Sequence, residues 1–134
     1  MTGEARQIVK EGIVSSVYPE RHAARIAFED KDGLISAELP VLTTWAFSNK
    51  SYGLPDVGEK VICLFLTNDE TSGAGVIIGS RYHDKSTPVV SSQDKARIDF
   101  SDGTFVEYDR ASHELKIECV GDIHIKGKNV HINE

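Results

Sequence analysis

The sequence predicts an all-β protein in which a small N-terminal barrel is followed by a ladder of short strands. Apolar and polar residues alternate with a period of two, as where Leu115, Ile117 and Cys119 alternate with Lys116 and Glu118. Two Asp-Gly pairs, at 32–33 and 102–103, mark tight hairpin turns. From residue 12 onward the signals are all those of strands and turns. Together these patterns indicate antiparallel β-structure.

The N-terminal part is expected to contain five strands. The run at 60–66 (KVICLFL) is apolar throughout, which predicts a central strand buried on both faces. Five short strands in residues 12–82, with a long connection between the third and the fourth, indicate a small closed barrel of the OB type. The expected strands are residues 13–18, 23–28, 34–39, 60–66 and 74–80.

The long connection at residues 41–58 holds three aromatic residues, Trp45, Phe47 and Tyr52. A loop of this length is usually either functional or part of an interface. The aromatic residues fit a sugar or peptide site, or packing in an interface of the barrel or of an oligomer, and we favour packing. Residues 1–11 form an N-terminal arm that is either a helical turn or frayed.

The ladder occupies residues 95–134, after a linker at 83–94 that is rich in Ser, Pro and Asp. Its expected strands are 96–101, 104–109, 113–120, 122–126 and 129–133, and Val-His-Ile at 130–132 repeats Ile-His-Ile at 123–125. So short a segment buries too little surface for a core of its own, and its open edges invite pairing. We therefore expect copies of the ladder to share one core. The residues assigned to that core are Leu115, Ile117, Cys119, Ile123, Ile125, Val130 and Ile132.

Composition excludes several classes of function. The net charge of −6, from 15 basic and 21 acidic residues, argues against binding to a nucleic acid backbone. No apolar run reaches the length of a membrane span, and residues 1–11 lack the apolar stretch of a signal peptide, so we expect folding in the cytosol. Cys63 and Cys119 lie in apolar strand patterns and are expected to be small buried hydrophobes, not a disulfide.

No catalytic site is expected. The carboxylates of Asp99, Asp102, Glu107 and Asp109 cluster in sequence, but on strands beside a turn such a cluster is typical of a solvated face. The histidines beside turns have no nucleophile or acid at the spacing of a catalytic triad. We therefore predict that the protein is not an enzyme.

Several segments, in order along the chain, resemble the phage baseplate assembly protein V family. They are residues 12–17 (GIVSSV), 39–42 (LPVL), 54–61 (LPDVGEKV) and 75–80 (GVIIGS). The resemblance extends into residues 97–107 (RIDFSDGTFVE) and so spans most of the chain. That family supplies the central spike of contractile tails, and the spikes of type VI secretion systems are related to it.

The resemblance implies a homotrimer with an OB-fold collar at residues 12–82 and an intertwined triple-stranded β-helix at residues 95–134. It implies a structural component of a contractile phage tail, or of a phage-derived injection device, that pierces the host outer envelope. Such a protein is assembled in the bacterial cytoplasm and becomes part of the baseplate of the virion. Its partners are tail hub and baseplate proteins, and Trp45, Phe47 and Tyr52 are the residues expected to dock onto the hub.

The family also binds an iron ion at the apex through a His-x-His pair from each chain. No His-x-His occurs in this sequence, and the nearest candidates, His124 and His131, are seven residues apart. Both alternate with apolar residues and are expected to be exposed, so no metal or other cofactor is predicted. Two explanations remain open: the sequence stops before the natural apex, or a separate tip protein completes the spike.

A different interpretation is an OB-fold binding module for an oligosaccharide or single-stranded nucleic acid. Nucleic acid would require a groove in which basic and aromatic residues alternate. The acidic balance of the chain argues against that ligand.

Overall fold

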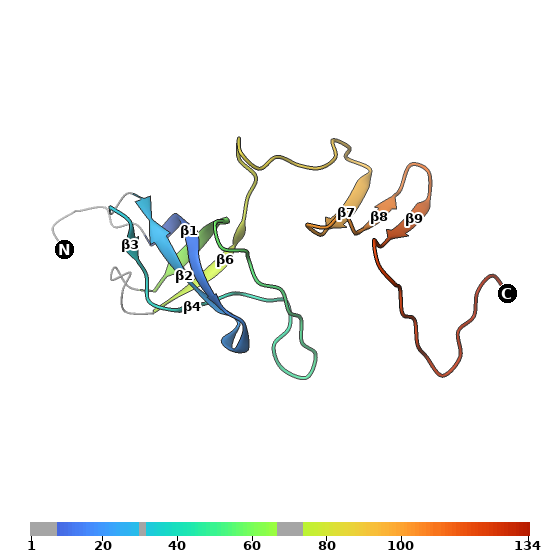
Figure 1. The fold of residues 1–134 in the computed structure, drawn as a ribbon, viewed down its shortest axis with the longest axis horizontal. Coiled ribbons are helices and arrows are strands. Elements are labelled where there is room, and N and C mark those ends of the chain that lie inside the picture. Colours follow the sequence, from blue (N-terminus) through green and yellow to red (C-terminus); the bar gives the residue numbers. More distant parts are fainter. Residues whose placement is uncertain (1–7, 30–31, 67–73) are drawn as a thin grey trace. The chain divides into compact units, whose positions relative to one another are not determined.

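The computed structural model describes residues 8–29, 32–66 and 74–134. These residues form antiparallel β-sheets, and they contain a 3₁₀ turn, η1 (Pro19–Arg21), but no α-helix. The all-β class predicted from the sequence is therefore confirmed. The chain divides into an N-terminal unit, Met1–His83, and a C-terminal unit, Asp84–Glu134 (Figure 1). Most of the predicted arm, part of the first Asp-Gly turn and the loop after residue 66 lie outside the described residues.

The sheet of the N-terminal unit has the strand order β3-β2-β1-β5-β6, and β4 also pairs with β2. β1 is antiparallel to both β2 and β5, so it is central in the sheet. The strands are β1 (Val9–Tyr18), β2 (Ala23–Phe28), β3 (Leu34–Ile35), β4 (Leu39–Pro40), β5 (Lys60–Phe65) and β6 (Gly75–Ser80).

The two ends of this sheet are joined directly after β4. Val41 forms a parallel bridge with Ile77 of β6. The backbone N–H of Leu42 then donates a hydrogen bond of 3.0 Å to the carbonyl of Ile77. Because β6 is the last strand in the order and β4 lies beyond β2, this bridge closes the sheet on itself.

The core of the N-terminal unit lies inside the closed sheet. Phe28 and Phe65 pack edge to face with ring centroids 5.8 Å apart. Burial raises the pKa of the Cys63 thiol to about 12, so this cysteine behaves as a small hydrophobic residue, as predicted. The buried core residues are Val14, Ala24, Ile26, Phe28, Leu39, Val61, Cys63, Phe65 and Ile77.

Two strands of this unit differ from the prediction. β1 begins at Val9, within the predicted arm, because Val9 and Lys10 pair with Leu64 and Cys63 of β5. β5 is not buried on both faces. Its alternate residues Val61, Cys63 and Phe65 are buried, whereas the residues between them are only partly buried. Because the sequence of β5 is apolar throughout, it did not reveal that only one face of the strand is fully buried.

The predicted strand at residues 34–39 is split into β3 and β4 by Ser36. The Ser36 side chain is buried, and its hydroxyl accepts a 3.0 Å hydrogen bond from the Ile26 N–H. That hydroxyl donates in turn to the Ala37 carbonyl at 2.7 Å. The Ile26 N–H therefore donates to a side-chain oxygen and not to a backbone carbonyl of the neighbouring strand, and this interrupts the strand.

The C-terminal unit contains a three-stranded antiparallel sheet, with the order β7-β8-β9. Its strands are β7 (Lys95–Asp99), β8 (Phe105–Asp109) and β9 (Glu114–Glu118). The predicted Asp-Gly hairpin joins β7 to β8: Gly103 has φ 99° and the Asp102 carboxylate accepts a 2.9 Å bond from the Thr104 N–H. These three predicted strands are confirmed, although each is shorter than predicted and β7 begins one residue earlier, at Lys95.

The predicted strands at 122–126 and 129–133 are wrong for the single chain. After β9 ends at Glu118, residues 119–134 are extended but contain no strand (Figure 1). A strand requires a hydrogen-bonded neighbour, and no segment within residues 8–29, 32–66 and 74–134 pairs with these residues.

Gly12 of β1 is buried in close contact with β2, and we expect Gly12→Ala to destabilise the N-terminal unit. A Cβ there would lie 2.4 Å from Ile26 Cγ2 and 2.8 Å from the Ala27 carbonyl oxygen. Because that oxygen belongs to the backbone ladder, it moves only at a cost of about 1–3 kcal/mol or more. The matched change Gly79→Ala adds a Cβ with no atom within 4 Å. Equal urea midpoints for the two variants would contradict this packing.

Candidate assembly interface

One face of the C-terminal sheet is apolar: apart from Tyr108, all of its side chains are aliphatic. The register aligns Ile98 with Val106 and Val106 with Ile117 across the three strands. Side chains opposite one another in register lie on the same face of a sheet, and alternate residues share a face. The residues of this apolar face are Ala96, Ile98, Val106, Tyr108, Leu115 and Ile117.

The apolar face is open to solvent in the single chain. Ile98 is 62% exposed, Leu115 64% and Ile117 57%. Among the described residues, every buried hydrophobic residue lies at or before Ile77. The one buried residue described in the C-terminal unit is Glu107, which is charged. This unit therefore has no apolar core of its own.

The extended segment after β9 adds further exposed apolar side chains, at Ile123, Ile125, Val130 and Ile132. Cys119 is only partly buried and its thiol donates a 3.6 Å bond to the Asp122 carbonyl, so the expectation that it is buried is wrong for the single chain. Both cysteines described are free thiols.

Of the residues predicted to form a shared core, the structure brings Leu115 and Ile117 together on the apolar face. The other five lie at or beyond residue 119, where no strand pairing fixes a face. The sequence analysis missed Ile98, Val106 and Tyr108. Their signal was present, since they alternate with polar residues in the two strands that precede β9.

The opposite face of the sheet is polar and held by ion pairs. Arg97 lies between two carboxylates, with Nε 2.8 Å from Asp99 Oδ2 and Nη1 2.9 Å from Glu107 Oε1. The Arg97 guanidinium also stacks on Phe105, with its central carbon 3.8 Å from the ring centroid. Lys95 Nζ lies 3.6 Å from Glu107. Glu107, with its side chain 3% exposed, is thus ion-paired and not part of a solvated face.

These contacts fix the charge states of the polar face. The hydrogen bond from Arg97 holds the pKa of the Glu107 carboxyl below its ordinary value, and Lys95 adds to the effect. Reciprocally, hydrogen bonds to Asp99 and Glu107 raise the pKa of Arg97. Both partners therefore stay charged at neutral pH, which sets the polar face apart from the apolar one.

The lowered pKa of Glu107 predicts that acid destabilises this sheet. A carboxyl whose pKa is lower when folded contributes stability above its unfolded pKa, here 4.5, and loses it as the pH falls through the folded value. Glu107→Gln removes the titrating group, so the variant is expected to be less stable at neutral pH and to lose less on acidification. Thermal melts at neutral pH and below pH 4.5, with the exposed Glu118→Gln as control, measure this. Identical acid sensitivity in wild type and Glu107→Gln would refute it.

The long loop after β4 presents its aromatic residues to solvent. Phe47 is 87% exposed, and Trp45 and Tyr52 are also exposed, so they do not pack inside the closed sheet of the N-terminal unit. The loop is nevertheless tied down by its backbone: the Ser51 N–H donates a 3.1 Å bond to the Trp45 carbonyl. His22 contacts the loop at two points, with Nδ1 3.0 Å from the Val41 carbonyl and Nε2 3.0 Å from the Gly53 carbonyl.

The histidines near the C-terminus are exposed and separate. His131 forms a hydrogen bond with Glu134, and His124 lies on the extended segment. In residues 8–29, 32–66 and 74–134, no three His, Cys, Asp or Glu side chains come together as a group that could hold a metal ion.

A scan against protein-family models and a search of curated proteins gave no match to this chain. No helix in the described residues is long and apolar enough to cross a membrane.

Proposed function

We propose that this chain is the central spike of a contractile phage tail, or of a phage-derived injection device, and that it works as a homotrimer. In this proposal the C-terminal units of three copies intertwine as a triple-stranded β-helix and bury their apolar residues together. The observation that carries the proposal is the apolar face of β7, β8 and β9, which is open to solvent in a unit that has no apolar core of its own.

Copies of the same chain are the fitting partner for this face. β9 is the last strand of its sheet, so one edge of it remains available for pairing. The extended segment that follows β9 has apolar residues at alternate positions, such as Ile123 and Ile125, but pairs with no strand in the described part of its own chain. Each copy therefore offers both an open sheet edge and an extended segment, and in the intertwined trimer each of them gains a partner from another copy.

The collar in this proposal is an OB-type barrel formed by the N-terminal unit. If β3 and β4 are counted as one interrupted strand, five strands run in the order β3/β4-β2-β1-β5-β6. The parallel bridge between Val41 and Ile77 joins the outer two. This strand order and this closure support the OB architecture, which is a five-stranded Greek-key barrel. The family resemblance of the sequence implies the same collar.

Docking onto the tail hub is assigned to the loop with Trp45, Phe47 and Tyr52. Exposed aromatic residues are over-represented among the few residues that dominate binding energy at protein interfaces. In this structural role the chain needs no catalytic residue and no cofactor. Its partners are two further copies, baseplate proteins including the hub, and the host outer envelope, and it resides in the virion.

Negative-stain electron microscopy of the purified full chain tests the proposal. We expect elongated particles in which a collar tapers into a shaft, because the shared core requires parallel, in-register copies. Compact monomeric particles, together with saturable binding of an oligosaccharide or single-stranded DNA, would instead support an OB-fold binding module.

A further inference from the structure

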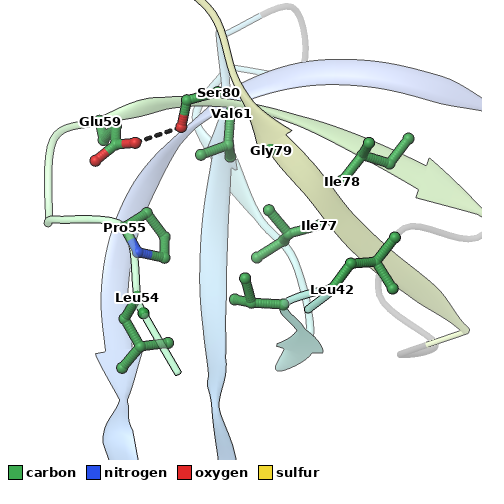
Figure 2. A pocket seen from close by; sticks show the side chains of 11 residues that line it. Leu42, Leu54, Pro55, Glu59, Val61, Ile77, Ile78, Gly79 and Ser80 are labelled. Carbon is green, nitrogen blue, oxygen red and sulfur yellow. Dashed lines mark hydrogen bonds between the residues drawn. The ribbon is translucent and has the colours of Figure 1, made fainter. Parts of the chain in front are cut away.

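A pocket of about 230 Å³ lies where the barrel of the N-terminal unit closes (Figure 2). Its lining includes Leu42 and Leu54, both from the long loop after β4, and Ile77 of β6. Pro55 completes the apolar wall. An engineered apolar cavity of about 150 Å³ is enough to admit benzene. The pocket is therefore large enough for one sizeable apolar side chain.

Two glycines keep the pocket open. A Cβ added at Gly53 or Gly79 would meet no atom within 4 Å, and neither residue has a positive φ. Gly79 lies in β6 beside an irregularity in its pairing with β5, where the register shifts between Ile62 and Cys63. Glycine inside a strand commonly marks a bulge or a place where another backbone approaches closely. The backbone conformation at Gly53 and Gly79 does not require glycine. The absence of a side chain at these two positions therefore serves to leave the pocket open.

The pocket has one charged end, formed by Glu59 and Ser80 (Figure 2). The Ser80 hydroxyl donates a hydrogen bond to Glu59 Oε2, and the Asp56 N–H donates one of 3.0 Å to Glu59 Oε1. The turn before β5 fixes Glu59 further, since its N–H donates to the Asp56 carbonyl at 3.0 Å. Both donors described for the carboxylate are neutral. Because a carboxylate has about four acceptor positions, it retains capacity for a cation.

The outer edge of β6 is the third element of the site. β6 is the last strand in the sheet order, and on its outer side the structure describes a bridge from Val41 to Ile77. Beyond this bridge, along the Ile78–Ser80 stretch that lines the pocket, no further pairing on that side is described. Such an edge can take an extended peptide as an added strand.

We propose that this pocket binds an extended segment of a partner protein in which an apolar side chain is followed by Lys or Arg. The segment adds to the edge of β6, its apolar side chain fills the space beside Gly79, and its cationic group pairs with Glu59. The proposal goes beyond the spike function and does not depend on it, because the pocket lies wholly within the N-terminal unit.

An NMR titration of the ¹⁵N-labelled full chain with acetyl-SLRS-amide tests this. We expect saturable shifts of the backbone amides of Gly53, Gly79 and Ser80, with a dissociation constant in the millimolar range. Acetyl-SLES-amide carries a negative charge in place of the positive one. Its affinity is expected to be lower by a factor of about ten or more, because a charge-assisted hydrogen bond is lost. The same loss is expected for acetyl-SLRS-amide with Glu59→Gln.

The variant Gly79→Leu fills the pocket, and Ser91→Leu adds the same side chain at an exposed position of the C-terminal unit. We expect Gly79→Leu to abolish the shifts at Gly53 and Ser80, and Ser91→Leu to leave them unchanged. Unaltered binding to Gly79→Leu, or no shift at these amides in the wild type, would overturn the pocket assignment. Equal binding of the SLRS and SLES peptides would overturn the assignment of the cation to Glu59.

Discussion

Replacing Ile117 with lysine is expected to abolish self-assembly, whereas replacing its neighbour Glu118 with lysine should leave assembly intact. Both residues belong to β9, but they face opposite ways: Ile117 pairs with Val106 on the apolar face, and Glu118 pairs with Phe105 on the polar face. In the proposed trimer, a lysine at 117 would be buried near two copies of itself.

The expected loss of trimer stability from Ile117→Lys is large because the threefold symmetry places the substitution in all three copies. Removing one unpaired charge from water costs several kcal/mol even after relaxation of the surroundings, and three copies incur that cost together. A surface substitution such as Glu118→Lys usually changes stability by no more than about 0.5 kcal/mol. Size-exclusion chromatography with light scattering gives the mass of each variant. If Ile117→Lys kept the mass of the wild type, the apolar face would not be the buried interface.

Replacing Phe28 with alanine is expected to give the largest loss of stability in the N-terminal unit. Phe28 is fully buried, with 0% of its surface exposed, and it packs against the ring of Phe65. Truncating a buried phenylalanine typically costs about 3–5 kcal/mol, from lost burial and from the cavity left behind. A unit of this size has little stability to spare, so the urea midpoint should fall sharply.

Phe47→Ala is the matched control, because it deletes the same atoms from a side chain that is 87% exposed. Its urea midpoint should stay close to that of the wild type, within about 0.5 kcal/mol of stability. If Phe47→Ala proved as destabilising as Phe28→Ala, the aromatic loop would be packed, in solution, against something that the single chain does not show.

The pattern of alternation was enough to locate most strands, because a strand with one buried face must alternate. It succeeded for β2, β6 and the three strands of the C-terminal unit, whereas β5 was located by its continuous apolar run. It was misleading at residues 34–39, where the buried Ser36 hydroxyl takes over part of the backbone bonding. It also could not tell that residues 122–133 lack a strand in the single chain, since pairing depends on a partner as well as on the sequence.

The candidate interface was predictable in part. Alternation identified Leu115 and Ile117, but Ile98 and Val106 joined them only once the register of the sheet was known. The pocket beside Gly79 gave no sequence signal. It arises from the bridge between Val41 and Ile77 and from an irregularity in β6, and both depend on tertiary pairing between distant segments.

Native mass spectrometry of the full chain at micromolar concentration tests the central claim most directly. If the C-terminal units share a core, the predominant species will have three times the 14.7 kDa mass of one chain, and dilution will not dissociate it readily. A stable species of 14.7 kDa, folded and with the apolar face of β7, β8 and β9 open to solvent, would contradict the account.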